Sequence, residues 1–278
     1  MDTIIGLGNA GCQIADRFAI YDQYTVFKID SENIEKGDRS LVLPRRNTPE
    51  QYEKKVPSLR RFFKGITKDV LFIVCGAGNI SGASLRVLQQ IKAKNINVLY
   101  IKPDLRFLGE TNILQENLVR HVFQEYARSG ILERLYIVDN GELEKVIGEV
   151  PVIEFYNKIN DLIASTIHMI NVYQHLDSVY STPHSNKNVS RISAPGLVDF
   201  SENQEKLFFS LDNVSEKCYY YAINQETLET DGKLLRRLTE SIAKNTNEED
   251  INTSFEIYST TYKENYGYIL ANTSETNN

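Results

Sequence analysis

The sequence predicts an α/β fold: a doubly wound parallel sheet, a long central helix and a smaller α+β second domain. Short apolar runs alternate with amphipathic stretches as far as about residue 150, and two of these runs end in glycine-rich turns. Alternating apolar residues after about residue 205 predict the smaller domain. The expected divisions are 1–151 for the sheet domain, 152–205 for the central helix with an insertion and a loop, 206–273 for the small domain, and a disordered polar tail at 274–278.

The composition is that of an ordinary globular protein, with 41% apolar and 24% charged residues. A net charge of −6 argues against a broad nucleic-acid surface but not against a local basic patch, and we expect no direct nucleic-acid binding. No apolar run is long enough for membrane insertion, and because the N-terminal residues predict a strand we expect no signal peptide. Three widely separated cysteines favour a reducing, cytoplasmic setting, and four histidines lack metal-ligand spacing, so no protein-ligated metal is expected.

The first glycine turn follows the opening strand, Thr3-Ile4-Ile5, and leads into a helix predicted over Cys12–Ile20. Its glycines fit the spacing G-x-G-x-x-G, and Asp30 ends the next strand, TVFKID. This is the fingerprint of dinucleotide binding, so a Rossmann enzyme that uses NAD is one reading of the sequence.

The second glycine turn, GAGNISG at 76–82, follows a buried strand over Val70–Cys75. An amphipathic helix is predicted from near Ala83, with apolar residues continuing to Ile91. A strand, a glycine turn and a helix together aim backbone N–H groups at a phosphate. Two such turns in one domain favour a phosphate ligand over tight turns without a ligand.

Between and beyond these turns the helix and strand signals alternate. Residues 31–49 indicate a loop, and Thr48 is placed to cap a helix that begins at Pro49 and runs to about Lys64, with a kink or break at Pro57. Next come a strand at 97–103, a helix at 112–129, a C-cap at Gly130 and a strand at 134–140. The expected apolar face of the helix at 112–129 consists of Ile113, Leu114, Leu118, Val122 and Tyr126.

Ligands in parallel sheets bind beyond the carboxyl ends of the strands, so both glycine turns and the Lys102-Pro103 loop should border one site. Farther on, a helix is predicted over about 152–176, and 177–194 indicates a flexible insertion. Four strands, at 206–212, 217–224, 253–261 and 266–273, and one helix near 232–244 are expected in the small domain.

Seven motifs, in order and at suitable spacing, resemble those of the tubulin/FtsZ family from Ile4 to Asn272. They are GNAGCQI at 8–14, NTPE at 47–50, GAGNISG at 76–82, IKPD at 101–104, IVDNGEL at 137–143, EFYNKINDLI at 154–163 and PGLVDFSE at 195–202. The resemblance implies a cytoskeletal protein that binds GTP with Mg²⁺, polymerises head to tail with copies of itself and hydrolyses GTP at the subunit interface. It also implies a possible adaptor or cargo protein as partner.

The resemblance also implies roles for individual residues. Asp199 and Glu202 stand at the two acidic positions of the catalytic loop, which polarises the attacking water in the next subunit; in a second register, Asn171 to Asp177 takes that place. Asn160 stands where the family contacts guanine, Gln13 toward the base, and Glu110 where it could replace the missing acid of the ribose loop. The remaining nucleotide contacts implied are Gly8, Asn9, Ala10, Gly11, Cys12, Gly76, Ala77, Gly78, Asn79, Ile80, Ser81, Gly82 and Asn140.

The sequence also departs from the family. The second glycine turn lacks both threonines and two of the glycines, and the catalytic loop has no clear counterpart of the family's asparagine. These departures resemble those of compact phage and plasmid tubulins. They leave three readings open: a GTPase that forms filaments, a filament or interaction protein of the same fold without GTP turnover, and the Rossmann enzyme.

Overall fold

The computed structural model describes residues 1–66, 68–183, 190–200, 202, 204–246 and 251–277. The chain divides into two compact units, Met1–Ser165 and Thr166–Asn278, with helix α6 (Phe155–Tyr173) running from the first into the second. Part of the predicted insertion, at 184–189, lies outside the described residues. The predicted domain boundaries stay predictions. None of the described helices is long and apolar enough to cross a membrane.

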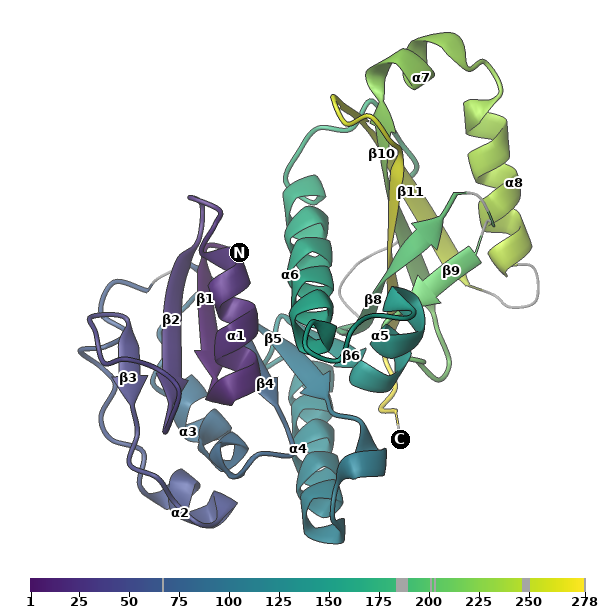
Figure 1. The fold of residues 1–278 in the computed structure, drawn as a ribbon. Helices are drawn as coiled ribbons and strands as arrows, with labels where there is room; N and C mark the ends of the chain where they lie inside the picture. The colour runs from purple at the N-terminus through teal and green to yellow at the C-terminus, as the bar shows by residue number, and fades with distance from the viewer. Residues whose placement is uncertain (67, 184–189, 201, 203, 247–250, 278) are drawn as a thin grey trace. The chain divides into compact units, whose positions relative to one another are not determined.

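The first unit is built on six parallel strands in the order β3-β2-β1-β4-β5-β6 (Figure 1). Helices cover both faces of this sheet, so its central strands are continuous apolar runs; Val70 to Val74 are fully buried. The strands are β1 (Thr3–Leu7), β2 (Thr25–Asp30), β3 (Ser40–Val42), β4 (Asp69–Cys75), β5 (Asn95–Lys102) and β6 (Arg134–Asp139).

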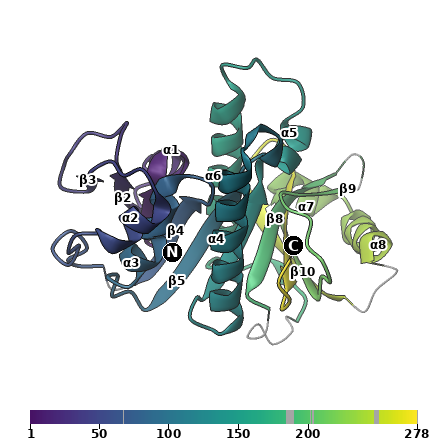
Figure 2. The ribbon, with the colours of Figure 1, turned by 90° about the horizontal axis from the view of Figure 1, so that it is seen from below.

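The helices of the first unit are divided between the two faces of its sheet. Figure 2 shows α1 (Gly8–Phe18) on one face and α3 (Ser84–Leu88) and α4 (Glu110–Arg128) on the other. Right-handed crossovers dictate this division, because the chain moves in opposite directions along the sheet after β1 and after β4. The remaining elements of this unit are α2 (Pro49–Lys54), α5 (Asn140–Ile147) and the 3₁₀ turns η1 (Asn79–Ala83) and η2 (Leu105–Phe107).

Three predicted helix ranges differ from the structure. Helix α1 begins at Gly8 rather than Cys12. Thr48 caps α2 as predicted, its side chain accepting a hydrogen bond from the N–H of Gln51 at 3.4 Å, but this helix ends at Lys54 because the chain must leave the α-region before Pro57. After the second glycine turn, η1 and the short α3 replace a helix extending to Ile91.

The predicted apolar face of α4 is correct only in part, since Ile113, Val122 and Tyr126 are half-buried. Leu114 and Leu118 are 69% and 62% exposed, whereas the helix buries a face that carries both charged and apolar side chains. This face can be buried because its charged groups pair with each other and contact the sheet. Its members are Glu116, Arg120, Phe123, Gln124 and Ala127.

The second unit is a mixed sheet in the order β8-β12-β10-β11-β7, with β9 paired to β8. Helices α7 (Gln225–Thr230) and α8 (Leu234–Thr246) connect the parallel strands β10 and β11, and α8 packs an apolar core against Tyr219, Tyr221 and Ile257. The strands are β7 (Tyr180–Ser181), β8 (Ile192–Asp199), β9 (Gln204–Leu207), β10 (Glu216–Asn224), β11 (Asn252–Thr260) and β12 (Tyr266–Thr273).

Strand β8 contains the segment PGLVD, where we expected a loop. Pro195 and Gly196 conceal the strand pattern, since both residues are unfavourable inside strands. Gly196 is tolerated here because its backbone lies close to β9, where a Cβ would approach the carbonyl oxygen of Lys206 to 2.6 Å. Within the polar tail, Asn277 is buried and its side chain accepts a hydrogen bond from the N–H of Asp212.

Candidate functional site

Both glycine turns lie at the same edge of the first unit's sheet. Strand register aligns Leu7 with Val74, Cys75 with Ile101, and Lys102 with Asp139, so four parallel strands end together. The structure therefore brings the two turns and the loop after Lys102 to one edge, as the sequence predicted, and it adds the start of α5.

The first turn packs α1 tightly against the sheet. A Cβ on Gly11 would lie 2.5 Å from the carbonyl oxygen of Ile73, and one on Gly6 would overlap Gly11. Gly8 has φ of +75°, which glycine adopts without strain, and α1 begins there without a side-chain cap. The first N–H groups of α1 are therefore available to an anion, and the helix dipole favours one there.

Only some predicted side chains of the first turn reach the surface. Asn9 and Gln13 are exposed and joined by a hydrogen bond of 3.2 Å from Gln13 Nε2 to Asn9 Oδ1. Cys12 is buried, and burial together with the nearby Asp30 raises the pKa of its thiol to about 12. The thiol therefore stays neutral, and Cys12 can contact a ligand only through its backbone.

The second turn is fastened by side chains from several elements. Ser81 Oγ donates to the carbonyl oxygen of Gly76 at 2.8 Å, and Gln115 Nε2 donates to Ser81 Oγ at 3.2 Å. Asn79 Nδ2 donates to the carbonyl oxygen of Asn47 at 3.0 Å. Gly78 is exposed, and a Cβ there would meet no atom within 4 Å. The loop is thus held in place while its middle stays open.

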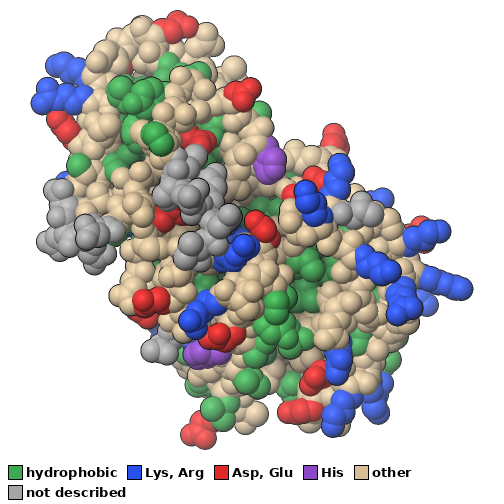
Figure 3. All heavy atoms as spheres, turned by 180° about the vertical axis from the view of Figure 1, so that it is seen from behind, with side chains coloured by type: hydrophobic (Ala, Val, Ile, Leu, Met, Phe, Trp, Pro, Cys, Tyr) green, Lys and Arg blue, Asp and Glu red, His purple; other side chains and the backbone are tan. Residues whose placement is uncertain are grey.

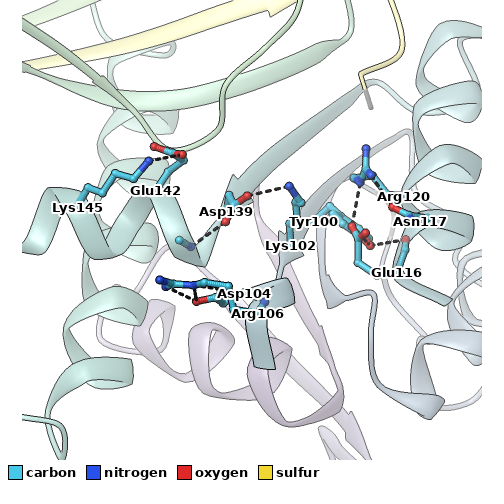
Figure 4. A network of polar contacts seen from close by, with 11 residues as sticks. Tyr100, Lys102, Asp104, Arg106, Glu116, Asn117, Arg120, Asp139, Glu142 and Lys145 are labelled. Atoms are coloured by element: carbon cyan, nitrogen blue, oxygen red, sulfur yellow. Dashed lines mark hydrogen bonds and ion pairs between the residues drawn. The ribbon is translucent and has the colours of Figure 1, made fainter. Parts of the chain in front are cut away.

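A buried polar network supports the second turn from beneath. A Cβ at Gly76 would overlap Tyr100 Oη, which donates to Glu116 and lies 3.1 Å from its Oε1. Arg120 Nε donates to the same Oε1 at 2.9 Å, and both charged residues are buried (Figure 4). The repeat of polar residues at positions 116, 120 and 124 was the sequence signal for this network, which our sequence reading missed.

The predicted base contacts lie together on α1 and the start of α6. Asn160 is buried, and its Nδ2 donates to Gln13 Oε1 at 3.1 Å. One turn farther along, Arg17 donates to Asp161 at 2.6 Å and to Asn157 at 2.9 Å. These contacts fix α6 against α1 and place two amide side chains beside the first glycine turn.

Asn140 and Glu110 each begin a helix near this edge. Asp139 caps α5 by accepting from the N–H of Gly141 at 2.7 Å, and it pairs with Lys102 at 3.0 Å (Figure 4). The Asn140 Oδ1 atom is buried and has no hydrogen-bond partner in the described part of the chain. Such an atom is suited to accept from a ligand. Glu110, the first residue of α4, is exposed.

The predicted catalytic residues belong to the second unit. Asp199 ends β8, its Oδ2 lies 2.9 Å from Lys206 Nζ, and its Oδ1 accepts from the N–H of Glu202 at 3.2 Å. Phe200 and Glu202, which follow this strand, each lie in a turn. Asp177, which belongs to the second register, is exposed in the loop that follows α6.

No protein-family model and no curated protein matches the sequence. Solved structures do match. GDP-form protofilaments of TubZ from Bacillus thuringiensis serovar israelensis align with a TM-score of 0.72 at 16% identity, over 98% of this chain and 87% of that one. The GDP-bound monomer of CetZ1 from Haloferax volcanii gives 0.69 at 16%, covering 100% and 95%. An empty FtsZ dimer from M. jannaschii gives 0.65 at 10%, covering 98% and 88%.

The chain therefore has the tubulin/FtsZ-like fold, and the predicted fold class is confirmed. In this fold it combines a parallel α/β sheet with a smaller mixed unit, joined through α6.

The geometry of the second turn predicts opposite results for two similar substitutions. We expect Gly76→Ala to lower the free energy of unfolding by about 1–3 kcal/mol, because the new methyl group must displace the buried Tyr100 ring. Gly78→Ala should leave stability almost unchanged, because its methyl group enters open space. Urea unfolding of both variants measures the difference, and equal stabilities would contradict the contact between Gly76 and Tyr100.

Proposed function

We propose that this protein binds GTP at the edge of its parallel sheet, assembles head to tail into filaments and hydrolyses GTP at the junction between subunits. The observation that carries the proposal is the meeting of two glycine turns beside the Gln13–Asn160 pair, within a tubulin/FtsZ-like fold. The similarity to TubZ in two-stranded and four-stranded filaments supports self-assembly.

The phosphates would be held by backbone N–H groups. Those of the first α1 turn are uncapped, and those around Gly78 border open space. Because α3 has five residues, the donors at the second turn are the loop amides rather than a long helix dipole. The described residues contain no group of three or more His, Cys, Asp or Glu side chains able to hold a metal, so Mg²⁺ would be held chiefly by phosphate oxygens.

The Gln13–Asn160 pair supports recognition of guanine. An amide side chain offers both a donor and an acceptor, and it can therefore match the amino and carbonyl edge of that base. The NAD reading has less support. Asp30 is buried, its carboxylate accepts from the N–H of Ser31 at 2.7 Å, and burial raises its pKa, so it is poorly placed to take a ribose hydroxyl.

We predict that GTP and GDP displace a fluorescent GTP analogue from the protein at far lower concentrations than ATP or NAD. Asn160→Leu should weaken GTP binding and reduce the preference over ATP, since it removes the amide while keeping a similar volume. Competition titrations followed by fluorescence anisotropy test this. Displacement by NAD but not by GDP would support the Rossmann enzyme instead.

We also predict that Gly78→Val abolishes GTP binding in a protein that remains folded. Gly78 has φ of −81° and open space around it, so valine causes no backbone strain but occupies the volume assigned to the phosphates. Circular dichroism reports folding and the anisotropy titration reports binding. Wild-type affinity for GTP in the folded variant would place the phosphates elsewhere.

Hydrolysis would need a carboxylate from the neighbouring subunit to orient the attacking water. Asp199 and Glu202 are the residues we propose for this role, and Asp177 is the alternative. In the isolated chain the charge of Asp199 is paired with Lys206, so this ion pair must open or rearrange when a neighbour docks. Asp177 is exposed on the loop after α6. The two assignments differ in which substitution stops turnover.

We predict that Asp199→Ala lowers GTP turnover by about a hundredfold while the monomer binds GTP normally, and that Glu202→Ala acts in the same direction. Turnover per wild-type subunit should rise with protein concentration, because the site is completed by assembly. Phosphate release across a concentration series measures both effects. A loss confined to Asp177→Ala would favour the second register, and activity that is absent at every concentration in a protein that forms filaments would favour a filament protein without turnover.

A further inference from the structure

One stretch of this acidic protein is strongly basic. Residues 36–64 carry only three acidic side chains, Asp38, Glu50 and Glu53, whereas the chain as a whole has a net charge of −6. Figure 3 shows Lys and Arg side chains gathered on one side of the first unit, over the β3 and α2 segments. We define the basic face by eight residues of this stretch: Lys36, Arg39, Arg46, Lys54, Lys55, Arg60, Arg61 and Lys64.

The cations of the basic face are available to a partner. Seven of the eight are exposed, and Arg46 is half-buried. The ion pairs formed nearby involve other cations: Arg45 with Glu32, Lys68 with Asp2, and Arg86 with Glu53. Within the described residues, no ion pair of the chain engages any of the eight.

A rigid loop displays three of these cations. Leu59, Phe63 and Ile66 are buried, and the ring of Phe62 lies 5.3 Å from that of Phe27 on β2. Gln90, which follows α3 in the chain, also holds this loop. Its Oε1 accepts from the N–H of Leu59 at 2.6 Å, and its Nε2 donates to the carbonyl oxygen of Pro57 at 3.1 Å. Because the backbone is already ordered, binding through the intervening Arg60, Arg61 and Lys64 has a small entropic cost.

We propose that the basic face binds the phosphate backbone of double-stranded nucleic acid. The cations come from helix α2 and from the loops before and after it, and they form a broad surface, which suits a regularly charged polyanion. Among the described residues 36–64, the exposed large apolar side chains comprise Val42 alone, at 39%, so a peptide or a bilayer would find little hydrophobic anchorage. The aromatic side chains of this stretch are buried or half-buried, so single-stranded bases have no stacking platform.

This binding is independent of sequence, because the contacts are to phosphates rather than to base edges. It also goes beyond the proposed GTP site and does not require it. The net charge led us to expect no nucleic-acid binding, and the basic face is the local exception that a net value conceals. Four of its cations are arginines, whose guanidinium groups can hold phosphate oxygens with two hydrogen bonds.

The test is fluorescence anisotropy of a labelled DNA duplex titrated with the nucleotide-free full chain at several salt concentrations. Wild type should bind with a dissociation constant of about 10⁻⁶–10⁻⁴ M near physiological salt, more tightly at lower salt. The combined variant Arg60→Glu, Arg61→Glu, Lys64→Glu should bind at least about tenfold more weakly, and its slope of log affinity against log salt should fall by about 2.7, at 0.9 for each lost contact.

The matched control is the combined variant Lys233→Glu, Lys244→Glu, Lys263→Glu, which changes three exposed lysines of the second unit and alters net charge equally. It should retain most of the wild-type affinity and slope. Circular dichroism and urea unfolding verify that both variants are folded. Equal losses of duplex affinity in the two variants would show that binding depends only on net charge, and this would overturn the proposal. So would binding of phosphatidylglycerol vesicles or polyglutamate without binding of the duplex, or no binding of the duplex at low salt.

Discussion

The close approach of glycine backbones to the parallel sheet is the constraint on which the first unit depends. Gly11 packs on the carbonyl oxygen of Ile73, Gly76 on the ring of Tyr100, and Gly82 on Pro49. None of these positions has room for a Cβ. The glycines therefore do more than permit turns, because they allow α1 and the second turn to lie so near the strand ends that their N–H groups converge on one edge.

The support of the second glycine turn has an energetic cost, because the Glu116–Arg120 ion pair of α4 is buried away from water. Glu116 and Arg120 are both withdrawn from water. Their ion pair and the hydrogen bond from Tyr100 offset part of the desolvation cost, while Glu116 Oε2 is buried without a hydrogen-bond partner among the described residues. Tyr100 of this network lies against Gly76. The network therefore fixes the position of the second turn relative to the strand ends. Stability of the sheet and shape of the proposed phosphate site are consequently determined by the same side chains.

Charge is distributed unevenly along the chain. As a result, the two surfaces that we propose as ligand sites differ in the groups that they offer to an anion. In our proposal, the strand-end edge would hold phosphates through neutral backbone amides, which need a defined geometry. The basic face instead presents long cationic side chains, three of them on a loop anchored by Phe62 and Phe63. The first arrangement favours a specific small anion, and the second favours an extended anion bound without a fixed register.

The sequence by itself determined the features that depend on neighbouring residues. The strand over Val70–Cys75, both glycine turns and the Thr48 cap follow from local patterns and are found in the structure. Tertiary contacts decided the rest. PGLVD forms a strand because β12 and β9 pair with it on either side despite Pro195 and Gly196. The buried face of α4 depends on the hydrogen bond from Tyr100 to Glu116. A helix with two possible faces cannot choose between them alone, because the choice depends on which face finds partners for its buried polar groups.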